Sequence, residues 1–404
     1  MDENIISRPE YMGRIAPFMG KDIIKVLSGM RRVGKSSLLR LLAKEYGQKE
    51  DAGPVVYLDM ESLENEGLRA YRPFYDEVKR RLSGRKGLVL VDEVQEIVGW
   101  EKALASLLAE NAADLVVTGS NASLFSGELA TLLAGRAVPV EIWPLSLSEF
   151  DRFYRTPSAS PEERFRLYLR YGGLPGLHQL DFNDTALMQF LDAIFSAIAL
   201  KDIIGRHAIR NVDLFERTLR FAFDNVGNLL SCKRIVDFLK SEHRSASVET
   251  VANHLTALQD AFILHQVLRW DLKGKRHLQV AEKYYAGDVG IRHAVIGYKD
   301  GDIGGVLENL VYLELRRRGY KVSVGQLPDA EIDFVAERGG GTVYVQVAYQ
   351  ADTPETVERE LSPLKSLRDR HPCRLLTMDQ AQGRNFDGVE RLYIPDFLRG
   401  QELA

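Results

Sequence analysis

Residues 29–36, GMRRVGKS, match the phosphate-binding pattern G-x-x-x-x-G-K-[ST] at every fixed position. In this pattern the glycines let consecutive backbone N–H groups curl around phosphate oxygens, and the positive end of the following helix attracts the same oxygens. We expect Lys35 to reach the β- and γ-phosphates of a nucleotide, and Ser36 to offer its hydroxyl to Mg²⁺. An ordinary strand-to-helix turn is the alternative. The predicted nucleotide-binding residues are Gly29, Arg31, Arg32, Val33, Gly34, Lys35, Ser36 and Ser37.

Two carboxylates, Asp92 and Glu93, close the apolar run GLVLVDE at residues 87–93. Beside a phosphate-binding loop, an Asp at the end of a strand holds Mg²⁺ directly or through water, and we expect this role of Asp92. Glu93 is then placed to orient and deprotonate the attacking water. The alternative is a strand that ends in solvated acids. The strand and helix expected between the two motifs favour the catalytic interpretation.

Polar residues at two further positions are candidates for the same site. The run DLVVTGS at residues 114–120 is followed by Asn121, and either Ser120 or Asn121 would lie between the γ-phosphate and the water; we favour Asn121. Either residue would also make a good helix N-cap. Arg136 follows a helix expected at residues 122–133, far from its own loop, and could reach the γ-phosphate of a neighbouring subunit. A solvated helix-terminal arginine is the alternative for Arg136.

The elements that must position these residues are strands that alternate with helices. Apolar runs of strand length and helical periodicities follow one another, and the reactive residues come after strand ends. This order predicts an α/β fold with a doubly wound parallel sheet and its chemistry at the carboxyl edge. The strands are expected at residues 22–27, 54–60, 87–93, 114–120 and 137–143, with helices at 71–82 and 122–133.

Composition limits the wider interpretation. At 404 residues the chain is long for one hydrophobic core, so we expect two or three domains. The net charge of −4 favours neither a nucleic-acid coat nor an acidic partner, so any basic surface must be local. Cys232 and Cys373 have no metal-type spacing, which suits a reduced, cytoplasmic protein. The sequence has neither a signal-peptide pattern nor about twenty consecutive apolar residues, so no membrane association is expected.

Residues 144–210 are expected to form a helical lid and linker, and residues 211–285 a winged-helix domain. The winged-helix elements are three helices and a hairpin, at 214–226, 232–241, 248–261, 262–270 and 277–280. Between Ser231 and Arg276, eight basic residues outnumber five acidic ones, which is weak evidence for DNA. If DNA binds, the third helix would enter the groove and the wing would meet phosphates. The groove residues would be Thr250, Asn253 and His254, and the wing residues Lys273, Lys275 and Arg276. Winged helices also dock proteins, so a protein partner stays open.

Residues 286–404 have the outline of a PD-(D/E)xK nuclease fold. Glu308 lies on a helix expected at 306–315, and Asp333 lies on a strand expected at 331–336. The nuclease chemistry also needs a third carboxylate and a lysine two residues after it, but Gln346 and Ala348 stand at these positions. We therefore expect a degenerate nuclease-like domain that is kept for binding or packing. The neighbouring strands are expected at 321–324 and 342–348.

Motifs along nearly the whole chain resemble those of bacterial and archaeal AAA-plus ATPases that carry a C-terminal domain of unknown function 4143. The matching stretches are GMRRVGKSSLL, VDEVQEIVGWEKAL, TGSNASL, LLAGR, PLSLSEF, YGGLPG, KDIIGRH, KYYAGDVGIRHA, GGVLENLVYLELRRRGY, EIDFVA and YVQVAY. The resemblance implies an ATPase core at residues 1–143, with ATP and Mg²⁺ as cofactors. It also implies that Pro175, in the turn at 171–176, lies near the base and ribose; a simple helix–helix turn is the alternative.

These patterns together predict a cytoplasmic, DNA-associated ATPase that acts as a homo-oligomer on duplex or branched DNA. Its nucleotide state would move the ATPase module against the winged-helix and nuclease-like domains. The alternative, from a different class, is a STAND-like signalling switch that hydrolyses ATP slowly and holds a protein partner. A third hypothesis, an active ATP-dependent nuclease, would need metal-dependent cleavage that is lost with Asp333.

Overall fold

The computed structural model describes residues 5–122, 135–154, 159–274, 276–351, 353–367, 369–380 and 385–403, without the side chains of residues 276–281 and 300. The chain divides into two compact units. The first comprises Met1–Ile142 and Asp260–Phe262, and the second comprises Trp143–Gln259 and Ile263–Ala404. The predicted ATPase core, which ends at residue 143, stops at this division. The helix predicted at 122–133 falls, apart from Ala122, outside the described residues.

The described part of the first unit contains a five-stranded sheet of order β2-β3-β4-β1-β5. All of its pairings are parallel, so the carboxyl ends of the strands meet at one edge. The predicted doubly wound parallel sheet is confirmed. Its strands are β1 (Ile24–Ser28), β2 (Val55–Asp59), β3 (Gly87–Asp92), β4 (Ala113–Gly119) and β5 (Ala137–Glu141).

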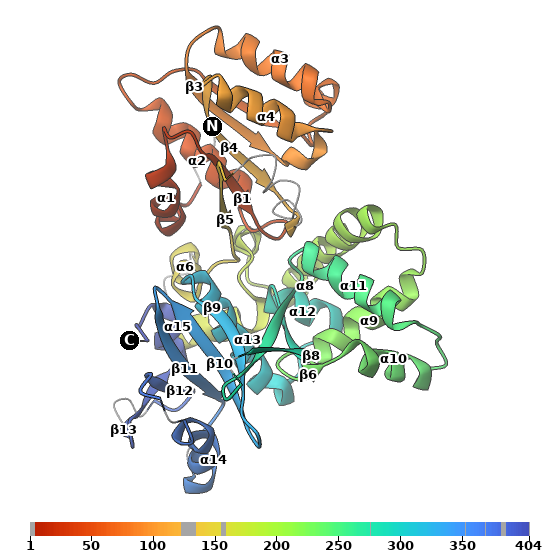
Figure 1. Cartoon of the computed structure of the whole chain (residues 1–404), viewed down its shortest axis with the longest axis vertical. Helices are drawn as coiled ribbons and strands as arrows, with labels where there is room; N and C mark the ends of the chain where they lie inside the picture. The colour runs from red at the N-terminus through yellow and green to blue at the C-terminus, as the bar shows by residue number, and fades with distance from the viewer. Residues whose placement is uncertain are drawn as a thin grey trace. The chain divides into compact units, whose positions relative to one another are not determined.

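Helices cover both faces of this sheet, and Figure 1 shows α3 and α4 on one side with α2 on the other. Because both faces are covered, β1, β3 and β4 are buried along their whole length. Helix α3 has the limits that its apolar spacing predicts, whereas α4 was not among the predicted helices. The helical elements are α1 (Pro9–Ile15), η1 (Ala16–Phe18), α2 (Lys35–Gly47), η2 (Leu63–Leu68), α3 (Tyr71–Leu82), η3 (Val94–Glu96) and α4 (Trp100–Ala109).

The described part of the second unit contains a nine-stranded mixed sheet of order β13-β14-β12-β11-β10-β9-β7-β8-β6. The strands are β6 (Leu229–Leu230), β7 (Leu264–Asp271), β8 (Arg276–Ala286), β9 (Lys321–Gln326), β10 (Glu331–Arg338), β11 (Gly341–Ala348), β12 (Cys373–Thr377), β13 (Asn385–Phe386) and β14 (Val389–Tyr393). The helices before β8 are α6 (Leu147–Phe153), α7 (Pro161–Tyr171), η5 (Pro175–Gln179), α8 (Asp184–Ala197), the π-helix η6 (Ile198–Gly205), α9 (Val212–Asp224), α10 (Cys232–Ser241) and α11 (Val248–Asp260). The later ones are α12 (Val289–Ile296), η7 (Asp300–Asp302), α13 (Ile303–Arg317), α14 (Pro354–Lys365) and α15 (Ile394–Arg399).

One sheet spans both of the parts that the sequence assigned to separate winged-helix and nuclease-like domains. Strand β7 pairs in parallel with β9, with Arg269 opposite Val324. The boundary expected between residues 285 and 286 therefore falls at the end of β8, inside a continuous sheet. The three helices and the hairpin occur near their predicted positions, but the mixed sheet does not confirm the winged-helix or the nuclease-like assignment. Strand periodicity reveals a hairpin but not which further strand pairs with it.

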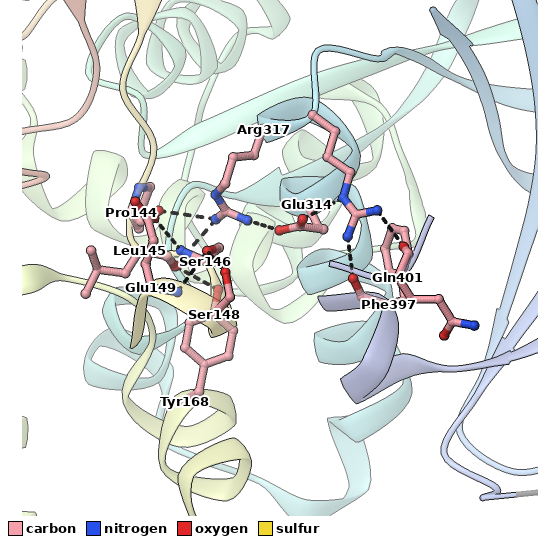
Figure 2. Close-up of polar contacts among 11 residues, drawn as sticks. Pro144, Leu145, Ser146, Ser148, Glu149, Tyr168, Glu314, Arg317, Phe397 and Gln401 are labelled. Carbon is pink, nitrogen blue, oxygen red and sulfur yellow. Dashed lines mark hydrogen bonds and ion pairs between the residues drawn. The ribbon is translucent and has the colours of Figure 1, made fainter. Parts of the chain in front are cut away.

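Figure 2 shows polar contacts that fix the backbone at the beginning of the second unit to neighbouring helices of that unit. Arg317, at the end of α13, donates to the carbonyl oxygens of Pro144 at 3.2 Å and Leu145 at 3.5 Å, and it pairs with Glu314. Tyr168 of α7 donates to the same Leu145 oxygen at 2.9 Å. The backbone that follows β5 is therefore fixed to α7 and α13. None of the helices in the described part of the chain combines the length and the hydropathy that a membrane span requires.

Candidate functional site

The phosphate-binding loop connects the carboxyl end of β1 to the first residue of α2, Lys35. The Lys35 side chain is 4% exposed, and its Nζ donates to the carbonyl oxygens of Gly29 at 2.8 Å and Met30 at 3.1 Å. A side chain at Gly29 is excluded, because its Cβ would lie 2.2 Å from the Ile142 carbonyl oxygen. Gly34 has a φ of 97°, a left-handed conformation that favours glycine. The loop thus curls around the lysine as the sequence pattern predicts.

Arg31, Arg32 and Val33 form the middle of this loop, and two of them contact other segments. Arg31 pairs with Glu61 at 2.9 Å, whereas Arg32 is exposed. Val33 is buried, and its carbonyl oxygen accepts a 2.9 Å hydrogen bond from the guanidinium of Arg8. The N-terminal segment ahead of the sheet therefore anchors the loop, a contact that no sequence motif marks.

Asp92, at the end of β3, is buried within a hydrogen-bond network. Its Oδ1 accepts from the Thr118 hydroxyl at 2.5 Å, and its Oδ2 accepts from the Tyr57 hydroxyl at 3.1 Å. Burial raises the pKa of Asp92, while hydrogen bonds from Ser36 and Thr118 oppose this rise. The predicted metal-binding pair, Ser36 and Asp92, is therefore in contact. Thr118 also accepts the Glu93 backbone N–H at 2.9 Å, so it connects both carboxylate residues.

Glu93 follows with a φ of 55°, in the left-handed region, and is 8% exposed. Its Oε1 lies 3.9 Å from Lys35 Nζ, and its Oε2 accepts a hydrogen bond from the side-chain amide of Gln95. Burial alone would raise the pKa of Glu93, but the charge of Lys35 and hydrogen bonds from Gln95 and Ser120 outweigh it, so the pKa is lowered. Glu93 is therefore ionised at neutral pH and can accept a proton.

Of the remaining predicted site residues, Ser120 contacts the Lys35–Asp92–Glu93 group, whereas Arg136 lies at the other edge of the sheet. Ser120 hydrogen-bonds to Glu93, whereas Asn121, the favoured candidate, is half-buried at the next position and its role stays a prediction. Arg136 is exposed just before β5, where its carbonyl oxygen accepts the Ile24 N–H at 2.8 Å. Strands β1 and β5 are parallel, and Ile24, the first residue of β1, lies opposite residue 137, the first residue of β5. Arg136 therefore lies at the amino edge of the sheet, whereas the phosphate-binding loop lies at its carboxyl edge. Its predicted action on a neighbouring subunit is an untested prediction.

Pro175 begins η5 in the second unit, within the turn YGGLPG. The preceding Gly173 donates its N–H to Asp288 Oδ2 at 2.8 Å, and a Cβ at Gly172 would lie 2.2 Å from Asp288 Oδ1. The turn therefore packs closely against the beginning of α12. Its expected position near a nucleotide base stays a prediction.

The three residues of α11 that were predicted to face a DNA groove differ in their exposure to solvent. Asn253 is exposed and Thr250 half-buried, but His254 is 5% exposed and packs edge-on against Phe215 with ring centroids 5.6 Å apart. The prediction that His254 enters a DNA groove is wrong, because α11 buries this side in the helical core. Lys273 is exposed, whereas Lys275 and the Arg276 side chain lie outside the described residues.

A second group of carboxylates surrounds Lys283, which β8 contributes and which is 3% exposed. Its Nζ lies 2.7 Å from Glu331, 2.9 Å from Glu308 and 3.4 Å from Asp333. Burial would lower the pKa of Lys283, but the three carboxylates outweigh it and raise the pKa. In the described part of the chain, no group of three or more His, Cys, Asp or Glu side chains is arranged to hold a metal ion.

The residues predicted for a nuclease-like site are thus assembled around an ammonium group. Glu308 also accepts a hydrogen bond from the Tyr285 hydroxyl at 2.6 Å, and the Gln346 side-chain oxygen accepts the Asp333 N–H at 3.3 Å. Burial, followed by the charge of Glu308, raises the pKa of Asp333 to about 7. Lys283 was not predicted, although it begins the stretch KYYAGDVGIRHA.

Comparison with known proteins agrees with the geometry of the first unit. Residues 21–151 match a family model described as an AAA domain, and residues 162–302 match one described as a domain of unknown function (DUF8612). An uncharacterized protein of Haemophilus influenzae is 35% identical over 404 residues, which covers 98% of this chain and 100% of that protein. The chain belongs to the same family as that protein. An uncharacterized Methanocaldococcus jannaschii protein is 28% identical over 397 residues, covering 92% of this chain and 85% of that protein.

A solved structure with a similar fold agrees with this comparison. The Walker-type ATPase of Pyrococcus abyssi has a TM-score of 0.52 and 17% sequence identity, and the similarity covers 72% of this chain and 95% of that one. At this identity the similarity shows the fold alone. Together with the AAA-domain match at residues 21–151, this places a P-loop ATPase-like domain in the N-terminal part of the chain. The match at residues 162–302 does not confirm the predicted domain of unknown function 4143.

Proposed function

We propose that the protein binds ATP with Mg²⁺ and hydrolyses it at the carboxyl edge of the five-stranded sheet. The observation that carries the proposal is the convergence of Lys35, Ser36, Asp92 and Glu93, which come from two separate motifs. Phosphoryl transfer needs positioning and charge neutralisation more than covalent chemistry, and these residues supply both.

Each residue of this group has a defined task in the proposed reaction. Lys35 exchanges its hydrogen bonds to the carbonyls of Gly29 and Met30 for bonds to phosphate oxygens. Ser36 and Asp92 fit Mg²⁺, because they present oxygen ligands that already contact each other, and the ion would neutralise phosphate charge. Glu93 accepts the proton of the attacking water. In an oligomer, Arg136 of a neighbouring subunit would add positive charge at the γ-phosphate.

The test of this proposal is steady-state ATP hydrolysis by the wild type and two variants. Lys35→Ala should weaken ATP binding, whereas Glu93→Gln should keep ATP binding and lose turnover, because the amide cannot accept the water proton. Binding is measured by fluorescence of a labelled ATP analogue. Normal hydrolysis by Glu93→Gln would refute the catalytic assignment.

We further propose that nucleotide state is transmitted to the second unit, which acts on DNA. Support for transmission comes from the segment after β5. The Ile142 carbonyl lies against Gly29 of the nucleotide-binding loop, and two residues later the Pro144 and Leu145 carbonyls are bound by Arg317. A shift of the nucleotide-binding loop would therefore move Ile142, and the backbone two to three residues later is fixed to α13. Support for DNA comes from the helices, the hairpin and the excess of basic residues between Ser231 and Arg276.

A protein partner held by a signalling ATPase is the second candidate function, because helices and hairpins of this kind also dock proteins. The two candidates differ in their response to DNA. ATP hydrolysis is measured with single-stranded, duplex and branched DNA at low and moderate salt, since phosphate contacts weaken as salt rises. Stimulation that disappears when Lys273, Lys275 and Arg276 become Ala supports the DNA role. No stimulation and no DNA binding at low salt would favour the protein partner.

A further inference from the structure

The two carboxylate oxygens of Glu93 have different partners. The side-chain amide nitrogen of Gln95, in η3, donates to Oε2, whereas Oε1 faces Lys35 Nζ at 3.9 Å. A carboxylate only accepts hydrogen bonds, so Gln95 must present its nitrogen to Glu93. Chemistry therefore fixes the orientation of the Gln95 amide.

The oxygen of the Gln95 amide indicates that the hydrogen bond to Glu93 determines the position of this side chain. Within the described residues, the Gln95 Oε1 atom is buried and has no hydrogen-bond partner. Leaving a buried acceptor unpaired is unfavourable, so the bond to Glu93 must compensate for it. Glu93 itself has a left-handed backbone, a strained conformation that is common where a side chain must be aimed at a reacting group.

We propose that Gln95 is a positioning residue that occupies Oε2 of Glu93 and thereby leaves Oε1 as the proton acceptor in ATP hydrolysis. This inference rests on the proposed function. When Lys35 turns to the phosphates, Oε1 faces the attacking water while Oε2 keeps its bond to Gln95, and the hydrogen bond from Ser120 continues to hold the carboxylate in place. The water oxygen forms a bond to the γ-phosphorus, and the bond from that phosphorus to the bridging oxygen breaks. The electron pair leaves with ADP, and the water proton moves to Glu93 Oε1.

The test replaces Gln95 by Met, which keeps the length of the side chain but cannot donate, and by Ala. Loss of an outer partner of a catalytic group typically reduces activity 10–100-fold, so we expect kcat to fall by about 10-fold. KM for ATP should stay within about twofold, because the phosphate contacts of Lys35 are kept. Gln48→Ala, at an exposed position after α2, is the matched control and should behave as the wild type. Circular dichroism identifies a variant that fails to fold, and the other variant then carries the test.

A double variant separates positioning from a general structural role. In a Glu93→Gln background, Gln95→Met should not lower the residual turnover further, because the group that it positions is already inactive; single-turnover assays at high enzyme concentration measure this residual rate. A wild-type kcat in folded Gln95→Met, with the wild type active, would overturn the inference alone. A loss of equal size in both backgrounds would also overturn it. If the wild type hydrolyses no ATP, the proposed function itself fails, and the inference fails with it.

Discussion

Each unit of the molecule buries a lysine close to carboxylates, but the two lysines have different partners. Lys35 donates to two backbone carbonyls, and its nearest carboxylate oxygen, on Glu93, lies 3.9 Å away. Lys283 lies within 3.4 Å of three carboxylates, those of Glu308, Glu331 and Asp333. Both ammonium groups are almost completely shielded from solvent.

The partners decide what each lysine can do. Bonds to neutral carbonyls can be exchanged for bonds to phosphate, because the exchange gains charge attraction and leaves no buried carboxylate without its counter-ion. The bonds of Lys283 cannot be exchanged in this way, since moving its ammonium would leave three carboxylates together. Lys35 is therefore available for a ligand, whereas Lys283 is a counter-ion that holds β8, β10 and α13 together.

The largest effect is expected from Lys283→Met. Removing one partner of a buried ion pair typically lowers the free energy of unfolding by about 3–5 kcal/mol, because the remaining charge is left unpaired. Urea denaturation measures the change. The matched control is Lys299→Met, which breaks an exposed 3.0 Å pair with Asp224 and should lower stability by less than about 1 kcal/mol. Equal unfolding midpoints for both variants would show that Lys283 does not hold the cluster together.

Lys35→Met should have the opposite profile. Loss of one charged group that stabilises a transition state reduces turnover by about 10²–10³-fold. The free energy of unfolding should fall less than in Lys283→Met, because the main partners of Lys35 are neutral carbonyls. ATP hydrolysis and urea denaturation are measured on the same preparations. A loss of stability as large as that of Lys283→Met would mean that Lys35 is also a structural counter-ion.

Thr118→Val sharpens the comparison at the first site. Valine has a similar shape but leaves the buried Glu93 N–H without its acceptor, which should lower the free energy of unfolding by about 1–3 kcal/mol. Asp92 loses a hydrogen bond at the same time, so Mg²⁺-dependent turnover should also fall. Ser106→Ala, which removes an exposed hydroxyl from α4, should change stability by less than about 0.5 kcal/mol. Unchanged stability and turnover in Thr118→Val would contradict the role of this hydroxyl.

The two sites also differ in how far the sequence predicts them. The chain alone places Lys35, Ser36, Asp92 and Glu93 together, because each follows a buried strand or begins a helix in a parallel sheet. Thr118 was not recognised, since its contact with Asp92 depends on β4 lying next to β3.

The second site depends on contacts that no local pattern specifies. Lys283 reaches Asp333 because the β7–β8 hairpin joins β9 and β10 in one sheet, and strand periodicity does not identify such partners. His254 shows the same limit, because the buried face of α11 is decided by the helices that pack against it. Local spacing therefore predicted β1–β5 and the P-loop residues, and it failed where distant strands and helices meet.

The smallest effect on ATP turnover is expected from Arg317→Met, which tests whether the two units communicate through the segment after β5. The variant removes the bonds to the Pro144 and Leu145 carbonyls, shown in Figure 2, and leaves Lys35, Asp92 and Glu93 unchanged. Basal ATP turnover should therefore equal that of the wild type. Hydrogen exchange of α6, measured with and without a non-hydrolysable ATP analogue, should respond to nucleotide in the wild type and lose this response in the variant.

The matched control for Arg317→Met is Arg359→Met, which removes a guanidinium that is 74% exposed and pairs with the neighbouring Glu360 at 2.8 Å. This control should keep the nucleotide response of α6. A response that persists in Arg317→Met would show that the bonds to Pro144 and Leu145 do not transmit nucleotide state. A response absent from the wild type would mean that nucleotide binding in the first unit is not transmitted to α6.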